Sequence, residues 1–183
     1  MLFIDRIDTP IGRFAIVADE AGRLRATGFE ENHARMEHEL RLQTKRADII
    51  LEEKKNPGGL SAALQRYFAG ELDAIVGLPL AIEGTEFQLS VWHALAEIPC
   101  GETRTYGQLA KRIGRPNAVR AVGLANGSNP VGVVLPCHRV IGSDGLLTGY
   151  GGGIERKAWL LAHERCVLPG TQQLALGFAK AKR

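Results

Sequence analysis

The chain has 183 residues and a formal net charge of +3, with 45% hydrophobic and 23% charged residues. These values are typical of a globular protein with one large or two small domains. A membrane span is excluded because no run of about 18 apolar residues occurs, and no signal peptide is expected. Three widely spaced cysteines without C-x-x-C spacing favour a reducing cytoplasm and argue against a disulfide scaffold or a structural zinc site.

The charges are unevenly distributed along the chain. Residues 1–80 carry 11 Lys or Arg against 13 Asp or Glu. Residues 101–140 carry six basic side chains and one acidic side chain, Glu102. A local basic excess indicates either a surface for a polyanion or an ordinary solvated helix face, and charge alone does not decide between the two.

The first 82 residues are predicted to form a small α/β domain with a structural role. Apolar runs separated by turn residues indicate strands, and Met36, Leu40 and Gln43 at helical spacing indicate a helix. The expected elements are an antiparallel three-stranded meander within residues 1–29, a helix over 31–43, a polar connection over 44–57 and a helix over 60–70.

Residues 83–168 are predicted to form a second, mostly helical domain that contains a helix–turn–helix. The expected elements are a helix over 85–98 with a capping box at Thr85 and Gln88, a helix over 105–113, a turn over 114–117 and a helix over 118–127. The last of these is rich in alanine and glycine, and a helical glycine costs about 1 kcal/mol relative to alanine. Close approach of another helix or of a nucleic-acid groove would explain this, and the basic charges favour the groove.

Cys137 and His138 follow an apolar run at residues 131–135, which is predicted to be a buried strand that Pro136 interrupts. A thiol reacts as thiolate and needs a base, which His138 could provide with Glu164 orienting the imidazole. Neighbours on a strand point to opposite faces, however, so a bridging water or a twist at Pro136 would be required. The pattern alone fits an inert buried cysteine beside a core histidine equally well.

The end of the chain is predicted to contain a glycine-rich loop, a helix and a tail. The loop over 146–153 lacks the G-x-x-x-x-G-K-[ST] pattern of a phosphate site. A helix begins at Ile154 and ends near Glu164, and residues 169–183 are expected to be a mobile tail. Cys100 is expected to be a packed thiol and Cys166 to be exposed.

Four segments together resemble one family. They are Asn129-Pro130, Pro136-Cys137-His138-Arg139-Val140-Ile141, Gly149-Tyr150-Gly151-Gly152-Gly153 and Lys157-Ala158-Trp159-Leu160-Leu161-Ala162-His163-Glu164. They resemble the methylated-DNA–protein-cysteine methyltransferases, also called O6-alkylguanine-DNA alkyltransferases, of the bacterial constitutive single-chain type. The resemblance is continuous from about residue 85 to 164 and weaker before it. It implies a ribonuclease-H-like α/β N-terminal domain joined to a winged-helix-like helix–turn–helix domain.

The resemblance also implies roles for individual residues. Cys137 would be the nucleophile and alkyl acceptor, His138 the base acting through a water, Glu164 its orienting carboxylate and Asn129 a hinge. Tyr106 would hydrogen-bond the flipped base, and Arg120 would fill the space that the base leaves. The full set expected to contact substrate or DNA is Tyr106, Arg120, Ala121, Asn126, Val140, Tyr150, Gly151 and Gly152.

The implied function is direct, stoichiometric repair of O6-alkylguanine, and more weakly O4-alkylthymine, in DNA. The implied partner is double-stranded DNA bound through its minor groove, with no cofactor, no metal and no membrane. The protein is expected to be a monomer, with clustering on DNA as the alternative. Two alternatives stay open: a sensor that binds alkylated bases without repair, and a cysteine hydrolase or thiol redox protein. Gly151 stands where some relatives have a serine, and Gly132 and Asn126 also depart from relatives with larger pockets, so tolerance for bulky alkyl groups is undetermined.

Overall fold

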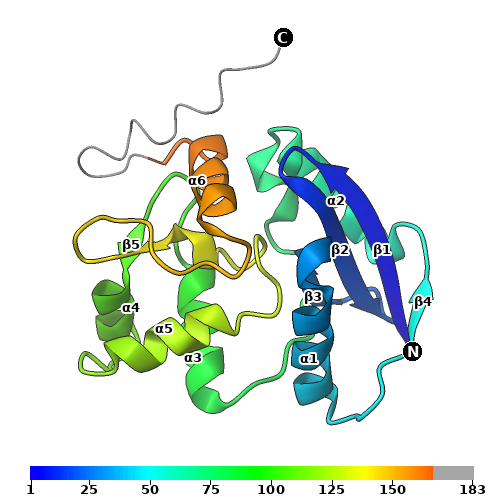
Figure 1. The fold of residues 1–183 in the computed structure, drawn as a ribbon, viewed down its shortest axis with the longest axis horizontal. Helices are drawn as coiled ribbons and strands as arrows, with labels where there is room; N and C mark the ends of the chain where they lie inside the picture. Colours follow the sequence, from blue (N-terminus) through cyan, green and yellow to red (C-terminus); the bar gives the residue numbers. More distant parts are fainter. Residues whose placement is uncertain (167–183) are drawn as a thin grey trace. The chain divides into compact units, whose positions relative to one another are not determined.

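The structure is a computed structural model that describes residues 1–166, so the expected mobile tail at 169–183 lies outside the described residues. The chain divides into two units (Figure 1). The N-terminal unit comprises Met1–Thr85 and the later segment Pro130–Val134. The C-terminal unit comprises Glu86–Asn129 and the chain from Leu135 onward.

A four-stranded sheet in the order β3-β2-β1-β4 forms the centre of the N-terminal unit. Strands β1 (Leu2–Thr9), β2 (Gly12–Asp19) and β3 (Leu24–Phe29) form the predicted antiparallel meander. Strand β4 (Leu51–Glu53) pairs with β1 in parallel, which makes the sheet mixed rather than purely antiparallel. This short edge strand lies in the segment predicted to be a polar connection, because two of its three residues are glutamates and its pairing uses only the backbone.

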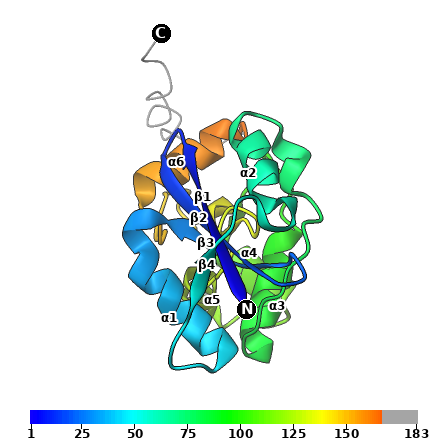
Figure 2. The ribbon, with the colours of Figure 1, turned by 90° about the vertical axis from the view of Figure 1, so that its right-hand side faces the viewer.

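Two helices cover opposite faces of this sheet, as Figure 2 shows. Helix α1 (His33–Thr44) buries Met36, Leu40 and Gln43, the three residues whose spacing predicted it. Met36 and Leu40 pack in one core cluster with residues of all three meander strands. Helix α2 (Leu60–Phe68) packs on the other face, where the rings of Phe68 and Phe14 lie 5.7 Å apart.

Two glycines allow two turns of the N-terminal unit to touch. The short 3₁₀ helix η2 (Pro57–Gly59) precedes α2, and Gly58 has a φ of 61°. A Cβ added at Gly58 would lie 2.5 Å from the carbonyl oxygen of Gly22, in the turn between β2 and β3. No side chain fits there, and the positive φ disfavours any residue other than glycine.

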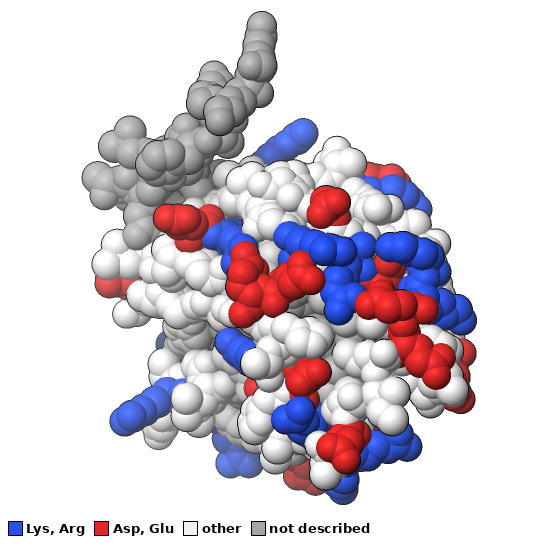
Figure 3. All heavy atoms as spheres, turned by 45° about the vertical axis from the view of Figure 1, so that its right-hand side comes forward, with Lys and Arg blue, Asp and Glu red and all other residues white. Residues whose placement is uncertain are grey.

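Basic and acidic side chains of the N-terminal unit pair with one another. Arg23 lies 2.7 Å from Asp19 and Arg25 lies 3.3 Å from Glu83. Figure 3 shows blue and red side chains next to one another on the face that it draws. Asp19 and Glu83 are therefore each paired with a neighbouring cation.

The C-terminal unit is mostly helical, as predicted. Its elements are α3 (Glu86–Ala96), β5 (Arg104–Thr105), α4 (Tyr106–Arg112), α5 (Val119–Gly127), β6 (Val140–Ile141) and α6 (Ile154–His163). Helices α4 and α5 form the predicted helix–turn–helix. Helix α4 begins with a capping box, in which Thr105 Oγ1 accepts from the backbone N–H of Gln108 at 3.1 Å and Gln108 Oε1 accepts from the N–H of Thr105 at 2.8 Å. The indole N–H of Trp92 in α3 donates to the carbonyl of Ala125 in α5 at 2.9 Å, which fixes these helices together.

The predicted strand at residues 131–135 is wrong. Val131 forms one isolated bridge with Thr27, and a turn follows in which Val133 has a φ of 76°. The N–H and hydroxyl of Thr27 donate to the carbonyls of Pro130 and Gly132 at 2.9 and 2.8 Å. The run is apolar because it is buried, and a short buried turn has the same composition as a buried strand.

Candidate active site

Cys137 and His138 lie on a single turn of 3₁₀ helix, η4 (Cys137–Arg139), and not on a strand. Pro136, with φ −81° and ψ 63°, leaves the extended conformation just before this turn. Cys137 is 7% exposed and His138 is fully buried. The objection that strand neighbours face opposite ways therefore does not apply, because the two side chains leave a helical turn.

His138 is held by a buried carboxylate and a buried guanidinium. Its Nε2 lies 3.0 Å from Oε1 of Glu164, at the C-terminal end of α6. Arg139 donates to both oxygens of the same carboxylate, from Nε at 2.7 Å and from Nη2 at 2.9 Å. Its remaining nitrogen donates to the carbonyl of Ile98 at 2.5 Å. A bidentate pair of this kind fixes both partners in position.

The charge states of the buried group His138, Arg139 and Glu164 follow from burial and pairing. Burial alone would raise the pKa of Glu164, but hydrogen bonds from His138 and Arg139 outweigh it and hold that pKa well below its usual range. Burial lowers the pKa of His138 despite the opposing effect of Glu164. The carboxylate is therefore ionised and paired with Arg139, while His138 is neutral.

Neutral His138 has one nitrogen left to act as a base. Its Nε2–H donates to Glu164, so the lone pair lies on Nδ1. Nδ1 is buried and has no hydrogen-bond partner among residues 1–166. An unpaired basic nitrogen of a buried imidazole, adjacent in sequence to a cysteine, can accept a thiol proton directly or through a water molecule.

Lys157 is a buried cation that the sequence did not single out. Its ammonium donates to the carbonyls of Val140 at 2.6 Å and Thr148 at 2.7 Å. Burial lowers the pKa of Lys157 to about 8, while the charge of an ionised Cys137 acts in the opposite direction. Lys157 thus joins β6 to the loop at 142–153 and places a positive charge within electrostatic reach of the thiol.

Tyr106, the first residue of α4, faces the same loop. Its hydroxyl donates to the Thr148 carbonyl at 3.4 Å, the oxygen that Lys157 also uses. Burial raises the pKa of Tyr106, and Cys137 raises it further, so the phenol also lies within electrostatic reach of the thiol. The rings of Tyr150 and His138 lie edge to face with centroids 6.5 Å apart. The structure therefore brings Tyr106, Tyr150 and the catalytic candidates together.

Asn129 connects the end of α5 to the segment before the cysteine. Its side-chain amide donates to the carbonyl of Leu135 at 2.8 Å. Val140 is also near, but its N–H donates to the carbonyl of Cys137 and its carbonyl accepts from Lys157. Both backbone polar groups of Val140 are thus engaged within the protein.

The remaining predicted contact residues differ in exposure. Arg120 and Ala121 are exposed on α5, whereas Asn126 is buried on its inner face with an unpaired Oδ1. Gly151 is exposed and Gly152 is intermediate, in the loop before α6. The structure therefore places Asn126 on a different side of α5 from Arg120.

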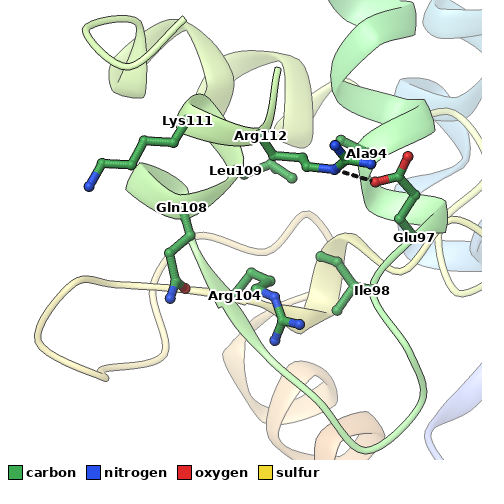
Figure 4. A pocket seen from close by; sticks show the side chains of 8 residues that line it. All are labelled: Ala94, Glu97, Ile98, Arg104, Gln108, Leu109, Lys111 and Arg112. Carbon is green, nitrogen blue, oxygen red and sulfur yellow. Dashed lines mark hydrogen bonds and ion pairs between the residues drawn. The ribbon is translucent and has the colours of Figure 1, made fainter. Parts of the chain in front are cut away.

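Two other thiols lie beside Glu164: Cys100 Sγ is 4.0 Å from the Glu164 carbonyl oxygen, and Cys166 follows Glu164 by two residues. Cys166 is 7% exposed, so the expected exposure of this residue was wrong, and burial raises the pKa of its thiol to about 12. A cavity of about 540 Å³ lies between α3, β5 and α4. Figure 4 shows Arg112 paired with Glu97 at its edge, 2.7 Å apart, and Lys111 extending away from it. Neither Cys137 nor His138 lines this cavity.

Neither a membrane-spanning helix nor a metal-binding cluster occurs in the described residues. Within the described residues, every helix falls short of the length and apolar character needed to span a bilayer. Likewise, residues 1–166 contain no group of three or more His, Cys, Asp or Glu side chains placed to hold a metal ion.

Sequence reasoning missed the roles of Arg139 and Lys157. Both lie in segments that carry the family resemblance, but the charge pattern groups Arg139 with the basic excess of residues 101–140, as a surface charge. It is 8% exposed and neutralises a buried carboxylate. The signal that could have found it is its position between a buried histidine and the apolar pair Val140-Ile141, where a free cation would not be tolerated.

Comparisons with known proteins agree across nearly the whole described chain. Residues 3–82 match the model of the 6-O-methylguanine DNA methyltransferase, ribonuclease-like domain, and residues 86–166 match that family's DNA binding domain. A methylated-DNA–protein-cysteine methyltransferase from Shigella flexneri is 50% identical over 167 residues, which cover 91% of this chain and 98% of the relative. A protein of the same name from Methanosarcina acetivorans is 47% identical over 157 residues, covering 86% and 94%.

A solved structure shows the same fold. An OGT from Mycobacterium tuberculosis, crystallised in complex with DNA, superimposes with a TM-score of 0.75 at 44% identity and covers 89% of this chain and 92% of its own. The structure of O6-methylguanine-DNA methyltransferase from Pyrococcus kodakaraensis gives a TM-score of 0.67 at 27% identity, covering 90% and 99%. The α/β unit followed by a helical unit is therefore the architecture of these proteins.

Proposed function

Because the chain belongs to the 6-O-methylguanine DNA methyltransferase family, we propose that it repairs DNA by transferring the alkyl group of O6-alkylguanine to Cys137. It is a methyltransferase of DNA repair, like the relatives that share about half of its sequence. The observation that supports this residue assignment best is the buried His138, whose Nε2 is taken by Glu164 and whose Nδ1 is unpaired.

The proposed reaction is a direct displacement. His138 Nδ1 takes the thiol proton through a water, and the Cys137 sulfur attacks the alkyl carbon. A sulfur–carbon bond forms as the bond from that carbon to O6 breaks, and its electron pair stays on the guanine. The hydroxyl of Tyr106 and backbone N–H groups at Gly151 and Gly152 are the proposed donors to the guanine as it leaves. Glu164 stabilises the imidazolium that forms on His138.

The proposed substrate complex requires an extruded base. O6 lies inside the duplex, so a buried thiol can reach its alkyl group only if the nucleotide is flipped out. We propose that α5 docks in the minor groove, that Ala121 approaches the backbone and that Arg120 fills the vacated space. The small residues of α5 and its exposed Arg120 support this docking, because the groove is narrow and negatively charged.

In the proposed reaction the protein is consumed stoichiometrically. The product is a thioether on Cys137, which water does not readily hydrolyse, so one molecule repairs one lesion and is spent. O4-alkylthymine is proposed as a poorer substrate. A cytoplasmic location is also part of the proposal, supported by the three free thiols at Cys100, Cys137 and Cys166.

A mass measurement tests the proposal. The protein is incubated with a duplex that contains one O6-methylguanine, and the intact protein and its peptides are weighed. We expect a gain of one methyl group on Cys137, absent in Cys137→Ser and retained in Cys100→Ser. A methyl group on Cys100, or no mass change with catalytic turnover, would overturn the proposal. Tight lesion binding with unchanged mass would support a non-repairing sensor instead.

A further inference from the structure

Helix α5 presents one bulky apolar side chain to solvent. Leu124 is 72% exposed, which makes it the most exposed large hydrophobic residue of the C-terminal unit within the described chain. The same helix buries Val122, Ala125 and Asn126 against its own unit. Leu124 therefore belongs to the solvent-exposed face of α5, opposite the face that packs on the core.

Leu124 shares this outer face with Arg120. Since successive residues of an α-helix are about 100° apart, Arg120 and Leu124 lie about 40° apart around the axis. By the same geometry Gly127 lies about 20° beyond Arg120 and Ala121 lies about 60° from Leu124 on its other side, so no other large side chain stands between Arg120 and Leu124. Val119, which is 40% exposed, lies about 140° from Leu124 by the same geometry. The outer face thus carries one cation and one isobutyl group beside the small residues Ala121 and Gly127, which are both exposed.

Single exposed leucines are common and need no explanation by themselves. This one differs because it lies one turn from Arg120, on the face proposed to enter the DNA. Residues 103–138 contain no acidic side chain, so the surroundings of this face in the sequence are suited to a polyanion. Apolar side chains are frequently used in the minor groove, where they press against or between base pairs.

We infer that Leu124 reads the base pair beside the lesion and favours A·T or T·A over G·C at that position. The inference rests on the proposed function and extends it to the sequence context of the substrate. In the minor groove, A·T and T·A pairs display only acceptor atoms, whereas G·C adds the guanine N2 amino group. That amino group projects from the groove floor and loses its water when an isobutyl group covers it, which is unfavourable.

The test measures single-turnover methyl transfer to duplexes that differ only in the pairs flanking O6-methylguanine. Each rate is divided by the rate of the same protein with the free O6-methyl-2′-deoxyguanosine nucleoside, which has no flanking pair. We expect transfer to be about five-fold faster with A·T than with G·C on one side of the lesion. Leu124→Ala should reduce this ratio to below about two-fold, and the matched variant Val119→Ala should keep it.

An inosine·cytosine pair identifies the groove. Inosine lacks the N2 amino group, so this pair resembles A·T in the minor groove and G·C in the major groove. We expect a flanking inosine·cytosine pair to behave like A·T in the parent protein. The inference is overturned if inosine·cytosine behaves like G·C, if the parent shows no flanking preference, or if Leu124→Ala keeps the preference. Failure of the proposed function is a different result, because methyl would then reach Cys137 from neither the duplex nor the nucleoside.

Discussion

Replacing Glu164 by glutamine tests the buried group that surrounds His138. The carboxylate accepts two hydrogen bonds from Arg139, and its side chain is fully buried while that of Arg139 is 10% exposed. In Glu164→Gln the guanidinium stays buried without its counter-charge. Removing one partner of a buried ion pair costs about 3–5 kcal/mol, so we expect the free energy of unfolding to fall by that amount.

The cause of this loss can be isolated with a second substitution. Arg139→Met removes the guanidinium, and the double variant Arg139→Met/Glu164→Gln leaves no unpaired charge in this group. The double variant should therefore be more stable than the sum of the two single losses predicts, by about 1–3 kcal/mol. Unfolding by urea, followed by circular dichroism, measures all four free energies.

The same substitution should slow methyl transfer for a separate reason. The neutral amide of Glu164→Gln cannot stabilise the imidazolium that forms when His138 takes the thiol proton, so transfer should slow by about 10²- to 10⁴-fold. Stopped single-turnover reactions weighed by mass spectrometry give the rate, at a temperature where the variant is folded. If Glu164→Gln unfolds within about 1 kcal/mol of the parent, Glu164 does not compensate a buried cation and the reasoning is refuted.

Three further outcomes are expected. Burial lowers the pKa of His138 below its ordinary 6.5, so the unfolded chain binds more protons than the folded chain just below that pH. The free energy of unfolding should therefore fall on acidification, by at most about 1.4 kcal/mol per pH unit. A His138→Gln variant with the same slope in urea titrations would contradict this. Lys157→Met removes the donor to the buried Val140 carbonyl and the Thr148 carbonyl, but it also removes a cation that burial disfavours. We therefore expect the free energy of unfolding to fall by no more than about 3 kcal/mol, with a larger relative loss of transfer rate. A variant that transfers methyl at the parent rate would show that the loop does not need this anchor. Gly58→Ala should destabilise the fold by about 2–4 kcal/mol, because the new Cβ would collide with the Gly22 carbonyl and residue 58 has a positive φ. Methyl transfer by the folded fraction should be unchanged. A thermal unfolding midpoint within error of the parent would contradict the close contact.

Elements with a strong periodic pattern were predictable from the sequence. Helix α1 was predicted from Met36, Leu40 and Gln43, and all three are buried. The helix–turn–helix was predicted from apolar spacing and from the turn residues between its helices. In both cases one face of a helix packs on the core, so the spacing of apolar residues in the sequence predicts the helix.

Other features depend on long-range pairing, which local pattern does not record. Strand β4 exists because the backbone of residues 51–53 pairs with β1, and its glutamates carry no strand signal. The buried run at 131–135 becomes a turn, and the Thr27 hydroxyl, from another part of the chain, holds its Gly132 carbonyl. Arg139 looked like a surface cation because its partner Glu164 is distant in sequence. The reaction could be proposed from the family resemblance alone, whereas the pairing of Arg139 with Glu164 is visible only in the structure.

The chain is interleaved between its two units just before Cys137. The segment Pro130–Val134 completes the N-terminal unit, although the stretch before it and the stretch after it belong to the other. A gene split after the codon for residue 85 would therefore give two incomplete polypeptides. The first would lack Val131, the bridge partner of Thr27. The second would expose Val131 and Val133, which are buried in the intact chain, as an aggregation-prone apolar loop. Domain truncation is thus a poor route to a minimal alkyl acceptor, and any attempt to graft the acceptor turn onto another scaffold must bring a substitute for Thr27 with it.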